Sequence, residues 1–531
     1  MEYDFPNKFQ VIVVGTGMVE SIVAAACSRI RLEVFHLDYS DHYGGLWASY
    51  NFEGLQKFIK EVKTNPSMKN VVYNLQEKWY INEDSSEEES KQDSEDHKTD
   101  DGKAEGTKKI WRRADFASEY RKFNIDTTPK LLFSRGLLVE LLISSDIARY
   151  TEFRCVTRVL TWLNDKLAPV PCSRADVFAT EAVSIVEKRM LMKMLTSIVG
   201  YNEEEMNNEF KDWNDKTFKE YLTHKGLTPN LIHYVLFAIA GGTNSMLCLE
   251  GVRECKKFLM SLGRYGNTPF LWPMYGSGDL PQCFCRLSAV FGALYCLNQP
   301  IDSIQTKTEE DGKTVVELKC KAKTLTCDHL VMDINECPKE LLSPEPEEES
   351  SDISRAIFIT NETIMPSEKE PLTLLRFPPL EEGGNAVTVL EVGPATGSCP
   401  KGLFLVYFFT PKVKDAESDL KPYAEKILNL SDGDQTETSD KPKCLWSLYY
   451  NVKDTNGSVR SGIDNVHVCR GPDAALDFDR AVEQAKEIFE KICPGKEFLP
   501  RSYRYNELVF EDVTPGPEFQ REDEDADGDK Q

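Results

Sequence analysis

The chain lacks the short sequence patterns that mark the commonest catalytic and metal sites. Its seven histidines include no H-x-x-x-H pair, and neither G-x-S-x-G nor G-x-x-x-x-G-K-[ST] occurs. The 15 cysteines include no C-x-x-C pair, and their odd number and wide spacing favour reduced thiols over a disulfide framework or a zinc site. We therefore predict no catalytic residues and no metal ligands.

Long apolar runs and basic clusters are also missing. No apolar run approaches the roughly 20 residues that span a bilayer, and the N-terminus lacks a signal-peptide pattern, so we expect a soluble cytosolic protein. The net charge is −24, but residues 83–105 and 511–531 contribute −8 and −7, which leaves only −9 for the rest. Because phosphate binding needs basic side chains, nucleic acid is not an expected partner.

The chain of 531 residues is too long for one ordinary core and should form two or three domains. Residues 82–109 and 511–531 are highly charged and poor in apolar side chains, so both are predicted to be disordered. Residues 172–262 are predicted to form a helical domain II, which interrupts a domain I made of 1–171 and 263–510. In domain II, helices are predicted over 181–200 with Thr180 as cap, 217–224 and 230–240.

The beginning of the chain predicts a strand–helix–strand unit of the dinucleotide-binding type. It has a β-branched run at 11–14, a glycine turn at 15–17, an Ala-rich helix over 18–30 and a strand over 32–37 that ends at Asp38. Glu20 stands at the third glycine position, on the helix turn that would have to accept an anionic pyrophosphate. We therefore expect the unit to form without a flavin or nicotinamide cofactor.

Residues 263–297 alternate aromatic residues with glycine and proline, so the first half should be a tightly turned loop. Asp279 is a plausible cap for a helix that stops at Gly292, before a strand over 294–297. Arg286 would lie on the same side of this helix as Asp279, either paired within a buried core or facing a partner. Further strands are predicted over 315–321, 330–333, 356–359, 372–377, 388–392, 403–409 and 445–451, before a last strand–helix pair.

These elements predict a mixed α/β fold: a flavoprotein-like, Rossmann-type domain I with an added β-sheet, interrupted by a smaller all-helical domain II. A flavoprotein-like scaffold with an altered nucleotide turn is better suited to binding a macromolecule than to redox chemistry, although fold alone does not decide function.

Long segments of the sequence resemble the Rab escort proteins, which are relatives of the Rab GDP-dissociation inhibitors. The resemblance covers nearly all of residues 8–510. It is strongest at VIVVGTGMVESIVAAACSR, HYGGLWAS, KFNIDTTPKLLFSRGLL, VPCSRADVF, VEKRMLMK and GRYGNTPFLWPMYGSGDLPQCFCRLSAVFG. The family has a flavoprotein-like domain I that uses no flavin, so the resemblance implies an accessory protein without catalysis.

The resemblance also implies partners. Such a protein presents an unprenylated Rab GTPase to the α/β heterodimer of Rab geranylgeranyltransferase, then shields the geranylgeranyl lipid and delivers the Rab transiently to membranes. Each buried CH₂ of a lipid contributes about 0.8 kcal/mol, so a doubly modified Rab needs an apolar shelter. The same comparison places a Rab-binding surface at Tyr43, Asp279, Arg286, Tyr295 and Cys296. Asp279 stands where dissociation inhibitors usually have Glu, and Cys296 where Met is usual.

Phe178 and Arg189 match the two residues by which escort proteins contact the transferase. Taken alone, Phe178 would more often be a core residue and Arg189 a solvated helix charge. These two residues, the segment 45–49 and the acidic insertion favour an escort protein over a Rab GDP-dissociation inhibitor, which is the first alternative. A flavin-dependent oxidoreductase is the second, and a flavin absorbance spectrum would reveal it.

Overall fold

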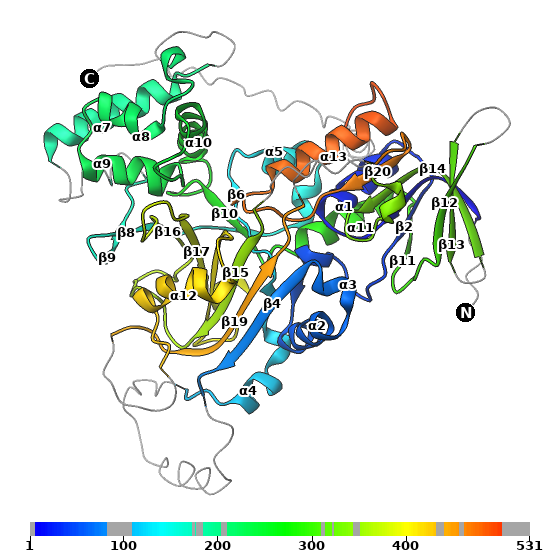
Figure 1. Cartoon of the computed structure of the whole chain (residues 1–531), viewed down its shortest axis with the longest axis horizontal. Helices are drawn as coiled ribbons and strands as arrows, with labels where there is room; N and C mark the ends of the chain where they lie inside the picture. The colour runs from blue at the N-terminus through cyan, green and yellow to red at the C-terminus, as the bar shows by residue number, and fades with distance from the viewer. Residues whose placement is uncertain are drawn as a thin grey trace, which may run out of the picture.

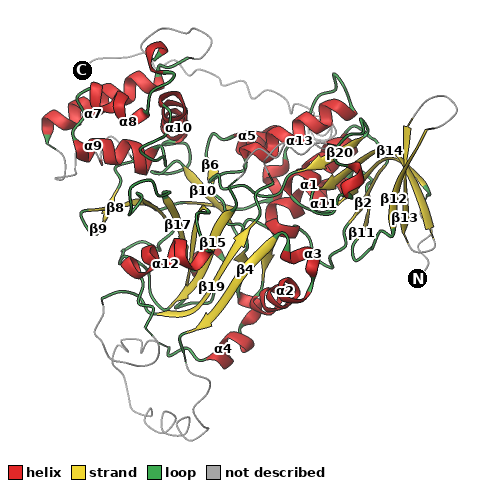
Figure 2. Ribbon diagram, viewed as in Figure 1, coloured by secondary structure: helices red, strands yellow, loops and turns green. Residues whose placement is uncertain are grey.

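A computed structural model describes residues 6–81, 109–172, 176, 184–202, 210–308, 314–320, 323–343, 351–431, 440–455 and 461–501. The acidic insertion, apart from Lys109, and the acidic tail lie outside these residues. The described chain has a seven-stranded and an eight-stranded sheet, with a group of helices at one end (Figure 1). In Figure 2, helices drawn in red lie beside the yellow strands of both large sheets. The predicted mixed α/β fold class is confirmed.

The seven-stranded sheet has a parallel core in the order β11-β2-β1-β14, with β20 beside β14 and an antiparallel hairpin β13-β12 at one edge. The β-branched run of β1 is buried on both faces, as a central parallel strand requires. The second strand begins later than predicted, because the chain still turns at Arg31 with a φ of 72°. The strands are β1 Lys8–Val14, β2 Val34–Leu37, β11 Leu294–Cys296, β12 Ser303–Thr308, β13 Thr314–Cys320, β14 Lys323–Asp333 and β20 Val466–Cys469.

Helix α1 (Met18–Arg29) crosses this sheet and is buried along its whole length, between α11 (Asp279–Val290) and α13 (Asp479–Ile492). Its small side chains allow α11 to approach closely. The Ser288 hydroxyl lies 2.8 Å from that of Ser28 and 3.2 Å from the carbonyl oxygen of Ala24. Hydrogen bonds between the two helices therefore fix the position of α11 on α1.

The eight-stranded sheet runs in the order β4-β19-β15-β18-β17-β16-β8-β9. The central strands β15 and β19 are buried at every residue, which accounts for their nearly continuous apolar sequences. Strands β8 and β9 form a hairpin at Asn164 and Asp165, and both residues have the positive φ of its turn. The strands are β4 Val72–Trp79, β8 Arg158–Leu163, β9 Lys166–Pro169, β15 Ile353–Thr360, β16 Thr373–Phe377, β17 Val387–Val392, β18 Phe404–Pro411 and β19 Cys444–Val452.

Smaller elements connect the two sheets. They are 3-10 turn η1 Gly45–Trp47, β3 Ser49–Tyr50, α2 Phe52–Thr64, α3 Pro66–Lys69, α4 Arg113–Ser118, β5 Ile125–Asp126, β6 Leu132–Phe133, α5 Leu137–Ser144, β7 Phe153–Cys155, β10 Phe270–Pro273 and α12 Ala416–Ile427. Helix α12 was not predicted from the sequence. The loop predicted for the first half of 263–297 is wrong in part, because β10 pairs there with β6 and β7.

The helical group contains α7 Ile185–Val199, α8 Phe218–His224, α9 Pro229–His233 with a π-helical continuation Tyr234–Ile239, and α10 Cys248–Ser261. The predicted start of the first helix is wrong. Ser184, not Thr180, caps α7, because Ser184 and Glu187 form a reciprocal capping box. The helix predicted over 217–224 is α8, with Thr217 as its cap and not its first residue, and α10 was not predicted.

The helical group shares a hydrophobic cluster with the eight-stranded sheet and is also joined to α13 and its preceding loop by ion pairs. The Lys257 ammonium of α10 lies 2.6 Å from carboxylate oxygens of both Asp477 and Asp479. Among the described helices, none has the length and apolar character needed to cross a membrane. The boundaries 172 and 262 of the helical domain stay a prediction.

Candidate functional site

The five residues of the predicted Rab-binding surface come from the loop that follows β2, from α11 and from β11. Helix α11 and strand β11 are joined by a turn at Gly292, whose φ is 100°. The end of α11 and the following strand agree with the prediction, but Asp279 is the first residue of the helix and not its cap. Gly278 occupies the cap position, where a Cβ would lie only 2.3 Å from the backbone nitrogen of Ser49.

The buried carboxylate of Asp126 fixes the loop that leads into α11. It accepts hydrogen bonds from the backbone N–H of Ser277 at 2.8 Å and from the Ser49 hydroxyl at 2.5 Å. Burial raises the pKa of Asp126 to about 6, while these donors oppose the rise. The start of α11 is thus held by a residue more than a hundred positions earlier in the chain.

Tyr43 and Tyr295 form an aromatic pair at the surface, with ring centroids 6.4 Å apart. Both side chains are partly exposed, but the Tyr295 hydroxyl points inward and lies 3.0 Å from Nδ1 of the buried His36. Cys296 follows Tyr295 and is also partly exposed. The backbone carbonyl of Cys296 accepts a hydrogen bond from Asp38, so the ends of β2 and β11 are held together.

Arg286 is exposed on α11, although most of that helix is buried. Its guanidinium lies 5.5 Å from the ring centroid of Tyr150, and among the described residues it makes no ion pair. Burial raises the pKa of Asp279, and the Cys283 thiol and the Arg286 charge oppose this rise. The alternative that Arg286 pairs within a buried core is therefore wrong: this charge faces solvent.

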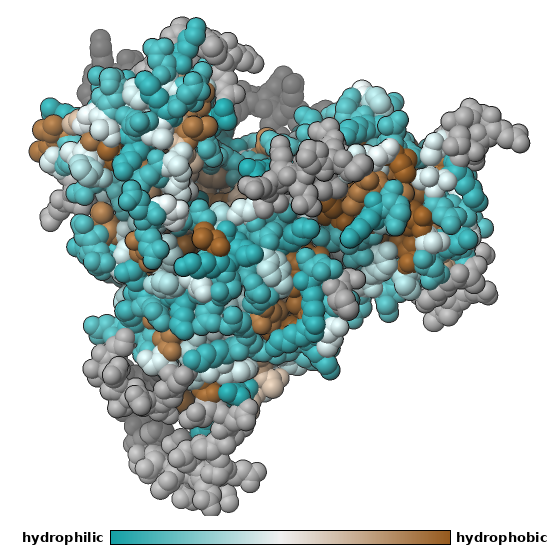
Figure 3. Space-filling model, in the orientation of Figure 1, coloured by the Kyte–Doolittle hydropathy of each residue, from teal (hydrophilic) through white to brown (hydrophobic). Residues whose placement is uncertain are grey.

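Exposed apolar side chains occur on the same helix as Arg286 and next to it in the chain. Val290 is 68% exposed at the end of α11, and Leu294 and Tyr150 are also exposed. Figure 3 shows brown, hydrophobic surface in the region of α11, β2 and β11. An exposed arginine among aromatic and aliphatic side chains is typical of the centre of a protein interface.

Arg189 lies elsewhere, on α7, which Figure 1 places at the far side of the molecule from β11. It is exposed, and Ile185 and Val186 at the start of the same helix are 71% and 66% exposed. Phe178 lies outside the described residues. The transferase contact by Phe178 and Arg189 stays a prediction.

The glycine turn does not fit a dinucleotide, and Asp38 shows the first reason. Its Oδ2 accepts hydrogen bonds from the backbone N–H and the hydroxyl of Thr16, at 2.8 and 2.6 Å. Its Oδ1 accepts from the backbone N–H of Ser40 at 2.7 Å. The carboxylate that would hold a ribose hydroxyl in a dinucleotide-binding unit is thus already occupied by the protein.

Glu20 gives the second reason. Its carboxylate folds back over the glycine turn, so that a Cβ on Gly17 would lie 2.5 Å from Glu20 Oε2. The side chain is 1% exposed, and its pKa is raised well above the ordinary value by burial and by Asp333. A buried acid on the first turn of α1 occupies the space and opposes the charge of a pyrophosphate. These residues do not fit a flavin or nicotinamide dinucleotide.

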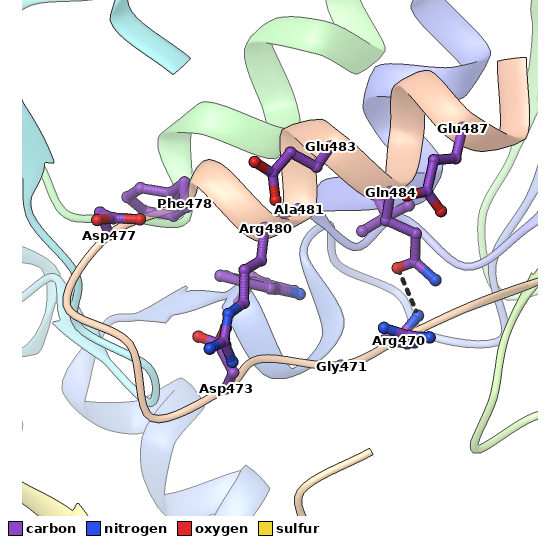
Figure 4. A pocket seen from close by; sticks show the side chains of 12 residues that line it. Arg470, Gly471, Asp473, Asp477, Phe478, Arg480, Ala481, Glu483, Gln484 and Glu487 are labelled. Carbon is purple, nitrogen blue, oxygen red and sulfur yellow. Dashed lines mark hydrogen bonds and ion pairs between the residues drawn. The ribbon is translucent and has the colours of Figure 1, made fainter. Parts of the chain in front are cut away.

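A cavity of about 300 Å³ lies between α13 and the preceding loop (Figure 4). Arg480 pairs with Asp473 at 3.5 Å, and Gln484 accepts a hydrogen bond from the backbone of Arg470. Four acids and two arginines line the cavity, so its lining carries more negative than positive charge. None of the residues predicted to bind a Rab or the transferase lines it.

Three contributors to the surface were not predicted from the sequence. They are Tyr150 beneath Arg286, Cys285 beside the tyrosine pair, and His36 behind Tyr295. Only His36 carries a signal in the sequence, as a histidine in the otherwise apolar strand β2. Its partner lies 259 residues away, so the contact could not be inferred from spacing.

The fold and the closed glycine turn define a flavoprotein-like scaffold whose nucleotide site is filled by its own side chains. Comparison with known proteins agrees. The GDP dissociation inhibitor family matches residues 5–81 and 107–500, so the chain belongs to that family.

Two relatives and one solved structure illustrate the relationship. The chain is 35% identical to the Drosophila melanogaster Rab proteins geranylgeranyltransferase component A, over 96% of this chain and 94% of that protein. It is 32% identical to the Mus musculus component A 2, over 96% of this chain and 100% of that protein. A Rab GDI crystal structure from Plasmodium falciparum has a TM-score of 0.64 at 18% identity, covering 93% of this chain and 100% of that one.

Proposed function

We propose that this chain is a Rab escort protein, a non-catalytic component of Rab geranylgeranyltransferase that binds a Rab GTPase before prenylation. The observation that carries the proposal is the relationship to proteins named component A of that transferase, at 32–35% identity over 96% of this chain. The filled glycine turn supports an accessory role over a flavin-dependent oxidoreductase.

The Rab would bind at the surface formed by Tyr43, Asp279, Arg286, Tyr295 and Cys296. Arginine and tyrosine are the residue types that most often dominate the binding energy of an interface. Here the exposed Arg286 guanidinium, which forms no ion pair with the described residues, lies over the Tyr150 ring on the same helix as the exposed Val290, and the Tyr43 and Tyr295 rings lie 6.4 Å apart. Such a surface offers a partner both a charge and preformed apolar area.

The transferase α/β heterodimer would bind at the helical group, through Phe178 and Arg189. Arg189 is exposed on a helix whose first turn is fixed by the Ser184 capping box and by a 2.6 Å hydrogen bond from Thr228 to Glu187. A rigid helix with an exposed arginine and exposed aliphatic residues beside it supports this proposal. Because the helical group and the Rab-binding surface occupy different parts of the molecule, both partners could bind at once (Figure 1).

After modification, the escort protein would shield the geranylgeranyl groups and deliver the Rab transiently to membranes from the cytosol. The physical requirement is the large apolar area of the lipid, since each CH₂ contributes about 0.8 kcal/mol to membrane or aggregate insertion. A Rab GDP-dissociation inhibitor would share the Rab-binding surface and the lipid shelter. It would not need a surface for the transferase.

The test is prenylation of a purified Rab by the transferase, with and without this chain, followed by incorporation of labelled geranylgeranyl groups. We expect incorporation to depend on the chain and to saturate near an equimolar ratio to Rab. Equal rates with and without the chain would contradict the proposal. Membrane extraction of prenylated Rab without any stimulation of prenylation would instead identify a dissociation inhibitor.

A further inference from the structure

His36 is a polar residue at the centre of the buried strand β2, and both of its ring nitrogens have partners. Nε2 lies 2.6 Å from the carbonyl oxygen of Gly15, and Nδ1 lies 3.0 Å from the hydroxyl of Tyr295. The His36 side chain is fully buried, and its ring lies 4.7 Å from that of Tyr295. The histidine thus connects the glycine turn to one of the two surface tyrosines.

The chemistry of the two partners fixes the protonation of His36. A carbonyl oxygen only accepts hydrogen bonds, so Nε2 carries the proton that is donated to Gly15. Burial lowers the pKa of His36 to about 4, so the ring is neutral and Nδ1 offers a lone pair. Burial raises the pKa of Tyr295 well above its ordinary value, so its hydroxyl keeps the proton and donates it to Nδ1.

The conformation of Gly15 makes this contact possible. Its φ of 97° lies in a region that side chains rarely adopt, and its N–H donates to the carbonyl of Leu37 at 2.8 Å. In this conformation, the glycine turn points the carbonyl oxygen of Gly15 at His36 on strand β2. The glycine turn therefore has a structural use that needs no cofactor.

The sheet register brings His36 and Tyr295 together. Strands β2 and β11 are parallel neighbours in which Tyr295 is paired with His36. The hydroxyl of Tyr295 points toward a residue with no exposed surface, so only the ring of this tyrosine is available to a partner. The ring of Tyr43 lies against the outer side of the same pair, 6.4 Å from the ring of Tyr295.

We propose that His36 is a positioning residue of the Rab-binding surface, which holds the Tyr295 hydroxyl inward so that a Rab meets the Tyr295 ring beside Tyr43. This inference rests on the proposed function, because it takes Tyr295 to be part of the surface that a Rab contacts. A Rab would then contact the apolar ring of Tyr295 and not its hydroxyl.

Two substitutions at His36 separate its two hydrogen bonds. His36→Asn can place an amide oxygen near the position of Nδ1, and so keeps an acceptor for Tyr295 while losing the Gly15 contact. His36→Gln can place an amide N–H near the position of Nε2, and so keeps the donor to Gly15 while losing the acceptor. Tyr295→Phe keeps the ring and removes the hydroxyl that His36 holds.

The measurement is the Kd of each variant for a GDP-bound Rab, together with its Tm. We expect His36→Gln and Tyr295→Phe each to weaken Rab binding about three- to tenfold, the effect of one lost hydrogen bond. The double variant should bind about as weakly as Tyr295→Phe alone, because the phenylalanine already removes the hydroxyl that His36 holds, together with its contacts to Ser288 and Cys285. His36→Asn should bind the Rab within about twofold of the unaltered protein, on the same scale.

His467 provides a matched control, because it is a buried histidine on β20 of the same sheet, on the far side of β1 and β14. His467→Gln should lower the Tm without changing the Kd. If His36→Gln fails to fold, the comparison of Tyr295→Phe with His36→Asn still decides the question. A merely structural His36 would lower the Tm in every variant and leave the Kd for Rab unchanged.

Arg286→Ala distinguishes failure of this inference from failure of the proposed surface. If Arg286→Ala weakens Rab binding while Tyr295→Phe and His36→Gln do not, the positioning role of His36 is overturned and the surface stands. If none of the three substitutions changes the Kd, the Rab-binding surface itself is wrong, and the inference falls with it.

Discussion

The two surfaces proposed to bind partners differ in how they are built. The Rab-binding surface depends on buried contacts between segments far apart in the sequence, such as Asp126 with Ser277 and His36 with Tyr295. The surface around Arg189 is one face of a single helix with its own capping box. Rab affinity should therefore respond to buried as well as exposed substitutions, whereas transferase binding should depend on exposed side chains alone.

The largest expected effect separates the two surfaces. Phe178→Ala combined with Arg189→Ala should abolish stimulation of Rab prenylation and leave the Kd for Rab within about twofold, because the helical group lies away from α11. Lys193→Ala, which removes an exposed charge from the same helix, is the control and should stimulate normally. Prenylation that is still stimulated by the double variant would show that the transferase does not bind through Phe178 and Arg189.

The next effect tests the exposed part of the Rab-binding surface. Arg286→Ala should weaken Rab binding about 10- to 30-fold, as expected for an interface hot spot, with no change in Tm. Titration of a fluorescent Rab would measure the Kd. Lys486→Ala, an exposed charge on α13, should leave the Kd unchanged. An unaltered Kd for Arg286→Ala would remove this residue from the site.

Glu20→Gln tests whether the filled glycine turn acts on stability alone. The folded protein binds the Glu20 proton more tightly than the unfolded chain does, since burial raises the pKa above its ordinary value of 4.5. Stability is therefore lost as the pH rises through the raised pKa. Glu20→Gln should raise the free energy of unfolding at pH 8, where the buried carboxylate is most costly, and have little effect at pH 4.

Urea denaturation of both proteins across this pH range would measure the difference in unfolding free energy. The Kd for Rab should stay the same, because Glu20 has no contact with the surface residues among the described side chains. Glu20→Gln could instead lose as much unfolding free energy between pH 4 and pH 8 as the unaltered protein does. The Glu20 charge would then not be the cause of the pH dependence.

The smallest effect concerns the cap of α7. Ser184→Ala removes a side-chain acceptor at the helix start and should cost about 1 kcal/mol of stability. Stimulation of prenylation should stay within about twofold of normal, because the exposed face with Arg189 is unchanged. Hydrogen exchange of the first turn of α7 would show the local loosening. A large loss of stimulation would mean that the surface depends on the geometry of the helix start.

Local signals in the sequence predicted much of the fold. The β1–α1–β2 unit and the helix over 217–224 depend on neighbouring residues, and the structure agrees with both to within a few residues. The start of α7 was misplaced, because Thr180 and Ser184 are both acceptable caps and only the capping box with Glu187 decides between them.

Several helices escaped prediction, and α10 and α12 show the physical reasons. Helix α10 begins after Leu247, which provides no side-chain cap, and α12 contains Pro422 in its interior. Their formation depends on packing against other elements, which a local pattern does not record. The same limit applies to the site: exposed Arg286 could be placed on a helix face from its spacing, but the His36–Tyr295 contact depends on the register of β2 and β11.

The central claim is that one chain holds a Rab and the transferase at the same time through separate surfaces. Sedimentation velocity of a labelled Rab, mixed with the chain and the transferase heterodimer, tests this most directly. The account predicts a ternary complex with the unaltered chain, and only the Rab–chain complex when Phe178 and Arg189 are both replaced by alanine. A ternary complex of full abundance with that double variant, or none with the unaltered chain, would contradict it.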